Sequence, residues 1–377
     1  MRDHAVRDFE ESFRSTGIEF FEKVEPFARL NWYYDPATVD PKSMLVWNSG
    51  GIGDNLYMTA VVAAIKKLIP QCQIDVVCQT THGLWNHNPD IRSVKWEFVP
   101  LETLNYYDAY FIVDEDVVKL VGAEQKNCYH KIFEMAGLPY SGEQPKITLS
   151  TLDEFQARNI VAGVVPGQHG DMSANYIVLG LHASTHTRDI SKEQWVSIAQ
   201  AIAEYGKEVN GFTIYSLAQN EHGHEIQKAL SAVPGHIPIF GARLTIRQIA
   251  ALIRTAFCVV SVDSMLVHLA AAVKAPCVGI YTTVPARARV ATYPPFIAGL
   301  WAEQACPWSG CSWKHDGFSV QHADVSLTNL CYTPDRQFCS VGAAIKAGHV
   351  LNAMEVVMGA KRDYDQYQIP SLPVFIL

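Results

Sequence analysis

The segment MLVWNSGGIGDN, residues 44–55, is the part of the sequence that best indicates the fold. Its first four residues are apolar, as in a short buried strand, and the glycines that follow favour a turn. Tyr57, Val61 and Leu68 then recur at helical spacing, and Pro70 ends that pattern. A strand, a glycine turn and a helix in this order begin a βαβ unit, so the segment predicts a parallel sheet covered by helices.

The same alternation of strand and helix continues along the chain and closes with a strand at 277–281. The other strand-like runs lie at 74–78, 109–113, 176–181, 212–216 and 258–261, and helical patterns lie at 152–162, 193–205 and 246–253. A turn-rich segment at 145–175 separates two such series, so we expect an α/β protein with two domains, each with a parallel sheet. Open sheets of this kind bind ligands at the carboxyl ends of their strands, which predicts a cleft between the domains.

These patterns divide the chain into four parts. We expect an N-terminal helical extension at 1–42, a Rossmann-like domain at 43–165, a second Rossmann-like domain at 166–350 with a cysteine-rich segment at 306–339, and a C-terminal tail at 351–377. The extension is predicted to pack on the main body. Docking to a membrane surface or to a partner is the alternative for this segment.

Composition excludes several classes of protein. Of the 377 residues 49% are hydrophobic and 18% are charged, which is not the composition of a disordered chain. A formal net charge of −8 argues against a nucleic-acid partner. The richest apolar stretch, 258–281, contains Asp263, His268 and Lys274, so no membrane-spanning helix is expected. The N-terminus has no apolar signal segment, and we expect a cytoplasmic protein whose nine cysteines are mostly reduced.

The glycine turn is the first candidate site. Glycines before a helix let a ligand approach the backbone, and the amino end of a helix favours anions. As a dinucleotide fingerprint the turn is weak, because Leu56 occupies the third glycine position. Asp54 has two interpretations, as the N-cap of the helix or as a general base facing the cleft.

Two segments of the second domain carry further candidates. Arg188 ends the loop HASTHTR, residues 182–188, whose hydroxyls and cation suit a phosphate at the end of a strand. Asp263 precedes a helix that contains His268, and the start of that helix offers free backbone amides to a phosphate. In isolation, the loop could be solvated, Asp263 could cap the helix, and His268 could be an interior histidine with its hydrogen bonds satisfied.

Taken together, these motifs resemble the ADP-heptose:lipopolysaccharide heptosyltransferases of glycosyltransferase family nine. The matching segments follow the family's order over residues 43–300, and the segment VDSMLVHLA at 262–270 is the most specific of them. The others are GIGDN at 51–55 with MTA at 58–60, Ala183 with Ser184, Trp195, and LTIRQIA at 244–250. The resemblance implies a GT-B fold, in which two Rossmann-like domains face an interdomain cleft.

The resemblance also implies a reaction and a set of site residues. It implies an inverting transfer of a heptose-like sugar from a nucleotide-sugar such as ADP-heptose, with no cofactor in catalysis and Asp54 as the base. The residues that it assigns to the donor are Gly53, Ser184, Thr185, Arg188, Asp263, Ser264 and His268. Two positions depart from the family: Arg188 stands where a lysine is common, and Ser216-Leu217 replaces a glycine pair on the nucleoside side.

Four cysteines near the carboxyl end form a separate candidate. Cys306, Cys311, Cys331 and Cys339 lie in a segment with few helix or strand signals. They could bind a structural Zn or Fe ion, form disulfides or remain thiols. The segment is similar in placement, but not in spacing, to the four-cysteine iron-binding finger of the protein-directed autotransporter heptosyltransferases.

Several functions remain open on the sequence alone. The main hypothesis is a glycosyltransferase that acts on a glycan, a lipid-linked glycan or a protein acceptor. It would work in the cytoplasm, with possible peripheral contact to the inner face of the membrane. A nucleotide-sugar epimerase or hydrolase on the same fold, and a non-catalytic protein that binds a nucleotide or glycan, are the alternatives. The sequence does not identify the sugar or the nucleobase of the donor, and it does not identify the acceptor.

Overall fold

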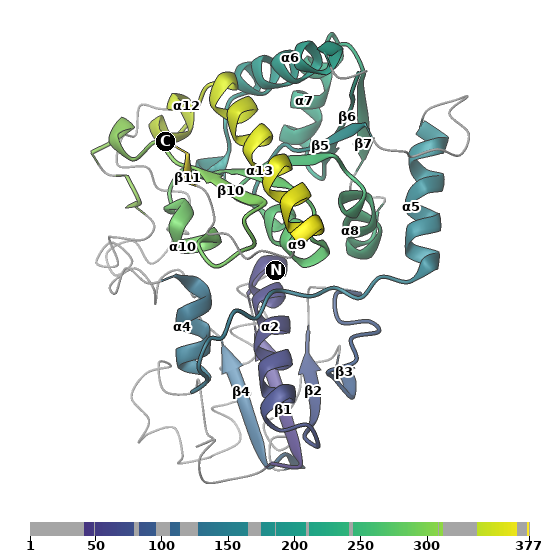
Figure 1. Ribbon diagram of the computed structural model, residues 1–377, viewed down its shortest axis with the longest axis vertical. Helices are drawn as coiled ribbons and strands as arrows, with labels where there is room; N and C mark the ends of the chain where they lie inside the picture. The colour runs from purple at the N-terminus through teal and green to yellow at the C-terminus, as the bar shows by residue number, and fades with distance from the viewer. Residues whose placement is uncertain are drawn as a thin grey trace.

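The protein folds into two parallel sheets with helices packed on them (Figure 1). The structure is a computed structural model. It describes residues 41–48, 50–78, 83–95, 106–113, 127–164, 175–184, 186–208, 211–240, 244–307, 309–311, 338–367 and 375–376. The predicted extension at 1–42 therefore lies almost wholly outside the described residues.

The first sheet has four parallel strands in the order β3-β2-β1-β4. These strands are β1 (Ser43–Asn48), β2 (Gln73–Val77), β3 (Ser93–Lys95) and β4 (Ala109–Val113). Helix α2 (Ile52–Leu68) follows the glycine turn after β1, and α4 (Cys128–Met135) packs against α2. This arrangement confirms the βαβ unit that the segment at 44–55 predicts.

The second sheet has seven parallel strands in the order β11-β10-β9-β8-β5-β6-β7. These strands are β5 (Tyr176–Gly180), β6 (Thr213–Ala218), β7 (His236–Phe240), β8 (Cys258–Val262), β9 (Cys277–Ile280), β10 (Ile297–Leu300) and β11 (Phe375–Ile376). The strand predictions at 176–181, 212–216, 258–261 and 277–281 are confirmed. The expectation that the last of them closes the series is wrong, because β10 and β11 continue the sheet beyond β9.

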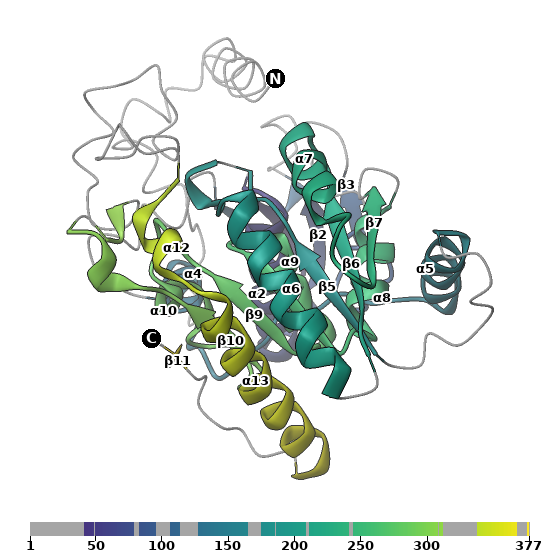
Figure 2. The ribbon, with the colours of Figure 1, turned by 90° about the horizontal axis from the view of Figure 1, so that it is seen from above.

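Helices cover both faces of the second sheet. One face carries α6 (Lys192–Glu208), α7 (Glu221–Leu230) and α13 (Ala347–Tyr367), as Figure 2 shows. The other face carries α8 (Ile246–Arg254) and α9 (Met265–Val273). The segment predicted as a tail, 351–377, thus contains most of α13, which packs on α6, β9 and β10. None of the helices that the structure describes is long and apolar enough to cross a membrane.

The face with α8 and α9 is turned towards the first sheet, and the two halves share one apolar cluster. Leu56 of α2 and Leu269 of α9 are buried in that cluster. Because α2 begins at the glycine turn and α9 begins just after Asp263, this contact brings the starts of the two helices to the same junction. We call this region the domain junction.

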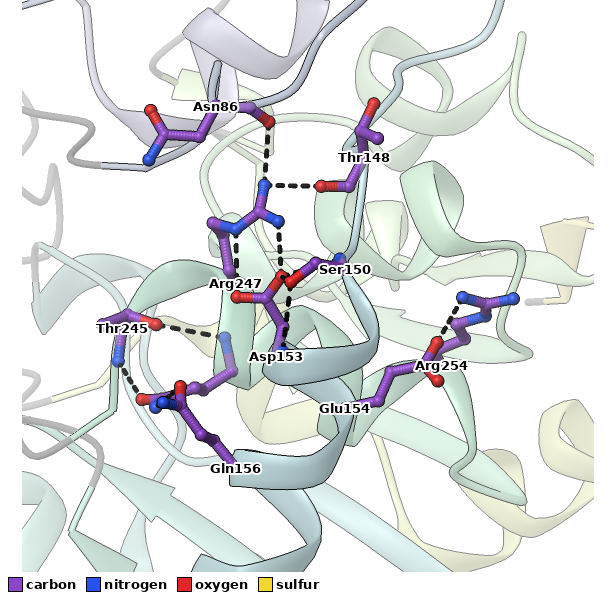
Figure 3. Close-up of polar contacts among 10 residues, drawn as sticks. Asn86, Thr148, Ser150, Asp153, Glu154, Gln156, Thr245, Arg247 and Arg254 are labelled. Carbon is purple, nitrogen blue, oxygen red and sulfur yellow. Dashed lines mark hydrogen bonds and ion pairs between the residues drawn. The ribbon is translucent and has the colours of Figure 1, made fainter.

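A buried arginine fastens the connection between the two halves (Figure 3). Arg247 of α8 forms an ion pair with Asp153 of α5 (Thr151–Val164), and its guanidinium also donates to the backbone carbonyls of Asn86 and Thr148. Asn86 follows β2, so the bonds join α8 to the first domain as well as to α5. Burial alone would raise the pKa of Asp153, but hydrogen bonds from Arg247 and Ser150 lower it to about 2.

We predict that Arg247→Ala destabilises the protein by about 1.5–3 kcal/mol, because the half-buried Asp153 carboxylate and two backbone carbonyls would lose their charged donor. Arg254→Ala is a matched control, since Arg254 pairs with Glu154 across the same two helices but in solvent. It should cost no more than about 1 kcal/mol. Urea unfolding of both variants measures the difference, and equal costs would contradict the assignment of Arg247 as the buried connection.

The same ion pair predicts how stability depends on pH. The folded-state pKa of Asp153 is about 2, below the unfolded value of about 3.9. The stability that the carboxylate contributes is therefore present above about pH 4 and is lost as the pH falls towards 2. The difference between wild type and Arg247→Ala should shrink over that interval.

Candidate active site at the domain junction

Asp54 lies in the first turn of α2, but it does not cap the helix. The N-cap is Gly51, whose backbone N–H donates to Oδ2 of Asp54 over 2.9 Å, so the carboxylate closes the turn from the third helical position. The N-cap interpretation of Asp54 is thus wrong. The chain is already extended at Gly51 (φ −67°, ψ −175°), and the helix begins at the next residue. The side chain of Asp54 remains 24% exposed, which leaves the carboxylate accessible.

The glycine turn itself is held by backbone and amide contacts. The Asn55 side-chain amide donates to the carbonyls of Gly50 and Gly51, each over 3.1 Å. The N–H of Gly50 donates to Oδ1 of Asn48 over 2.6 Å. A Cβ at residue 50 would lie 2.8 Å from Oδ2 of Asp54, so only glycine leaves room for that carboxylate.

His268 of α9 reaches across the junction to the glycine turn. A Cβ at Gly53 would lie 2.7 Å from Cδ2 of the His268 ring, so the ring occupies the space where a side chain would stand. Nδ1 of His268 is 2.5 Å from the hydroxyl of Tyr293. Burial, with a smaller contribution from Arg289, lowers the pKa of His268 to about 3, so the ring is neutral. The interpretation of His268 as an interior histidine with a hydrogen-bond partner fits these contacts.

Asp263 and Ser264 have different roles at the start of α9. Ser264 is the N-cap, and its hydroxyl accepts from the N–H of Leu266. The alternative in which Asp263 caps this helix is therefore wrong. Asp263 is 1% exposed, and its carboxylate faces two arginines instead. Oδ2 is 3.6 Å from Nη1 of Arg188, and Oδ1 is 4.0 Å from Nε of Arg289.

The predicted phosphate loop meets the Asp263 segment. Arg188 lies on the short helix η2 (His186–Arg188), and its guanidinium donates to the hydroxyl of Ser184 and to the carbonyl of Asp263. Thr185 lies outside the described residues. The structure thus brings Arg188, Ser184 and Asp263 together, and their role in binding a ligand stays a prediction.

Asp189, beside this loop, is a buried titratable group that sequence reasoning missed. It is 3% exposed and accepts from the N–H of Ala183 over 2.6 Å. Burial raises the pKa of Asp189 to about 7. Oδ2 of Asp189 is 3.8 Å from Nε2 of His222, which lies at the start of α7.

Arg289 is the functional candidate that the sequence analysis missed. It lies on α10 (Ala286–Val290) and is 7% exposed. Its Nη1 is 4.0 Å from Oδ1 of Asp54, and its Nε is the atom that faces Asp263. The available signal was an arginine eight residues after the strand predicted at 277–281, in a stretch whose one other charged residue is Arg287. Arg287 gives the same signal, however, and its side chain is exposed.

The cysteine segment is only partly described. Cys306, Cys311 and Cys339 are half-buried, whereas Cys331 lies outside the described residues. Within the described part of the chain, no group of three or more histidines, cysteines or carboxylates could hold a metal ion. The four-cysteine Zn or Fe site therefore stays a prediction, and no chemical step is derived through a metal.

Two parallel α/β sheets meet at a junction where carboxylates, arginines and a helix start come together, and this is the architecture of the GT-B class of folds. Comparison of families agrees with that class. Residues 123–306 match the model of glycosyltransferase family 9 (heptosyltransferase). Comparison with curated proteins by sequence gives no match.

Solved structures with the same fold cover most of the chain. ADP-heptose lipopolysaccharide heptosyltransferase II of E. coli is 14% identical, with a TM-score of 0.60 over 85% of this chain and 99% of that one. A family 9 glycosyltransferase of Veillonella parvula is 12% identical, with a TM-score of 0.53 over 84% and 97%. TibC, an iron-containing dodecameric glycosyltransferase of enterotoxigenic E. coli, is 13% identical, with a TM-score of 0.59 over 85% and 77%.

The contact between Gly53 and His268 gives a prediction about the junction. Gly53→Ala should destabilise the protein by about 1–3 kcal/mol, because the added methyl group overpacks against the His268 ring. In a His268→Ala background the same substitution should be neutral or stabilise by up to about 1 kcal/mol, since alanine is the better helix former. Gly51→Ala is the control, because a Cβ there would meet its nearest atom at 3.6 Å. Equal costs of Gly53→Ala in the two backgrounds, measured by chemical unfolding, would contradict the contact.

Proposed function

We propose that this protein transfers a heptose-like sugar from a nucleotide-sugar donor to an acceptor hydroxyl with inversion, at the domain junction. The observation that carries the proposal is the meeting of Asp54, from one domain, with Arg188 and Asp263, from the other, through Arg289. A transferase needs a base for the acceptor next to cations for the donor, and these residues supply both. The family 9 match supports the same reaction class.

Asp54 is proposed to act as the general base. An acceptor hydroxyl has a high pKa and must lose its proton as its oxygen attacks the anomeric carbon, so a carboxylate beside it lowers the barrier. One carboxylate oxygen of Asp54 accepts from Gly51 and thereby fixes the orientation of the group. The exposed part of the side chain is the part that an acceptor hydroxyl can approach.

Arg188 and the start of α9 are proposed to bind the donor diphosphate. The nucleoside diphosphate gains negative charge as it leaves, and a guanidinium can bind two phosphate oxygens at once. Backbone amides at the amino end of α9 add a partial positive charge on the same side. Gly53, Ser184, Thr185, Ser264 and His268 remain proposed donor-side residues on the strength of the family resemblance.

The nature of the partners remains part of the proposal. One solved structure of TibC is of that protein in complex with ADP-D-β-D-heptose, which makes an ADP-sugar the first donor to test. A glycan, a lipid-linked glycan and a protein are the acceptor classes proposed here. We also propose catalysis without a metal ion, and a cytoplasmic location with possible contact to the inner face of the membrane.

We predict that Asp54→Asn lowers the rate of transfer by about 100- to 10,000-fold and leaves donor affinity nearly unchanged. The variant is a close control for folding, because an asparagine oxygen can still accept from the N–H of Gly51. Rates with ADP-heptose and a panel of acceptors, together with donor binding by calorimetry, test the prediction. Near-normal turnover would show that Asp54 is not the general base and that its role is to hold the first turn of α2. A wild type that binds donors but never consumes them would favour a non-catalytic binding protein.

We predict that Arg188→Ala weakens both donor binding and turnover, with about 1.5–3 kcal/mol lost in binding, because one charged contact to phosphate is removed. Arg188→Lys should recover part of both, since it restores the charge without the planar fork. Calorimetry with a nucleoside diphosphate measures the loss. An unchanged affinity in Arg188→Ala would remove this residue from the donor site.

A further inference from the structure

Arg289 lies between the two domains and is held in place from both sides. Its own helix, α10, belongs to the half of the molecule that contains the second sheet. The side-chain amide of Asn127, at the start of α4, donates to the backbone carbonyl of Arg287 over 3.0 Å. The amide of Gln144 likewise donates to the carbonyl of Thr292 over 2.8 Å. Two bonds from the segment 127–144 therefore fix the backbone on either side of Arg289.

The guanidinium faces one carboxylate from each domain. Nη1 is 4.0 Å from Oδ1 of Asp54, and Nε is 4.0 Å from Oδ1 of Asp263. These separations are close enough for strong attraction in a buried setting and too long for hydrogen bonds. Within the described part of the chain, Nε has no hydrogen-bond partner. Nη1 makes a long contact of 3.9 Å with the sulfur of Cys128. Arg289 is therefore a buried cation that attracts Asp54 and Asp263 without being saturated by either.

The surroundings support a charged Arg289 beside an ionised Asp263. Burial would lower the pKa of Arg289, but neighbouring acidic groups, Asp263 and Asp54 among them, hold it well above its usual range. Burial would raise the pKa of Asp263, yet Arg289 and then Arg188 lower it. Both arginines thus stabilise the ionised form of that carboxylate.

We propose that Arg289 is a positioning residue that keeps the Asp54 carboxylate ionised and directed towards the donor side, across the domain junction. This proposal rests on the proposed role of Asp54 as the base. Contact between the domains then has a direct chemical effect, because the positive charge that stabilises the ionised Asp54 carboxylate comes from the other domain. The Asp54 carboxylate is then ionised and correctly directed only when α10 and α2 are docked.

Among the residues that the structure describes, the other titratable groups near the junction do not supply this charge. Among the described residues, the groups that face Asp54 or Arg289 from the packed elements are Tyr57 on α2, Cys128 on α4, Asp263 before α9, His268 on α9 and Tyr281 after β9. Burial raises the pKa of Tyr281 well above its usual value, so its hydroxyl is neutral. The pKa of Tyr57 lies well above its usual value because of burial, so its hydroxyl is neutral. His268 is also neutral, because burial lowers its pKa to about 3. None of these groups is a cation, whereas Nη1 of Arg289 lies 4.0 Å from Oδ1 of Asp54.

The first test measures the Asp54 carboxyl directly in the unliganded protein. Aspartate is labelled with ¹³C at the carboxyl carbon, and the Asp54 signal is assigned by its loss in Asp54→Asn. Arg289→Gln should raise the midpoint of its titration by about one pH unit or more, because a neighbouring opposite charge is removed. Arg289→Lys should restore part of the shift. Arg287→Gln, a change on the exposed side of the same helix, should leave the midpoint at the wild-type value.

The second test uses the pH dependence of the reaction. The acidic limb of kcat/KM reports the base of the free enzyme, so in Arg289→Gln it should move upwards by the same amount as the ¹³C titration. At neutral pH the main loss should be in kcat, with donor KM changing less than threefold. A merely structural role of Arg289 would lower stability without moving this limb.

The outcomes separate this proposal from the proposed function. An unshifted Asp54 titration in a folded Arg289→Gln variant would overturn the proposal, whatever the enzyme activity. A rise in donor KM with kcat and the acidic limb unchanged would also overturn it and make Arg289 a donor ligand. If Arg289→Gln does not fold, the comparison rests on Arg289→Lys. A titration midpoint of Asp54 in Arg289→Lys that is equal to or below the wild-type midpoint, at every ionic strength measured, would overturn the proposal. Full activity of Asp54→Asn, by contrast, would reject the base while leaving the ¹³C result intact.

Discussion

The close contact between the Gly53 backbone and the His268 ring is the constraint on which the junction depends. No side chain fits at residue 53 while the ring stays in place, so the two domains meet through backbone on one side and a neutral ring on the other. Asp54 is the next residue, and its position relative to the second domain therefore follows from this contact. The apolar packing of α2 on α9 then keeps the two helix starts together.

The charged residues at the domain junction also depend on the docking of the two domains. A buried carboxylate or guanidinium is costly unless a partner of opposite charge lies close by. Asp263 finds Arg188 within its own domain, and it shares Arg289 with Asp54 of the other domain. The charges at the junction are thus balanced only when the domains are docked. The candidate site is therefore a property of the docked pair and belongs to neither sheet alone.

Much of the fold could be predicted because buried parallel strands are short apolar runs, as at β1, β5 and β8. β7 was missed because Pro238 weakens a strand pattern, and this is tolerated since β7 lies at the edge of the sheet. The role of Asp54 in its helix depended on a boundary shift of a few residues, which sequence patterns do not resolve. Arg289 could not be assigned from local pattern, because its two partners lie far from it in sequence and meet it only through tertiary packing.

Arg247 and Arg289 are both buried cations, but they differ in how fully their hydrogen bonds are satisfied. Both belong to the half with the second sheet, and both face the first domain. Arg247 is saturated by Asp153 and two carbonyls, so its bonds hold the connection together. Among the described residues, Nε of Arg289 lacks a hydrogen-bond partner, and its carboxylates stand at ion-pair distance only. A buried donor without a partner costs stability, and such costs persist where they serve function. The incomplete bonding of Arg289 leaves its field directed at Asp54 and Asp263, where the proposed chemistry requires it.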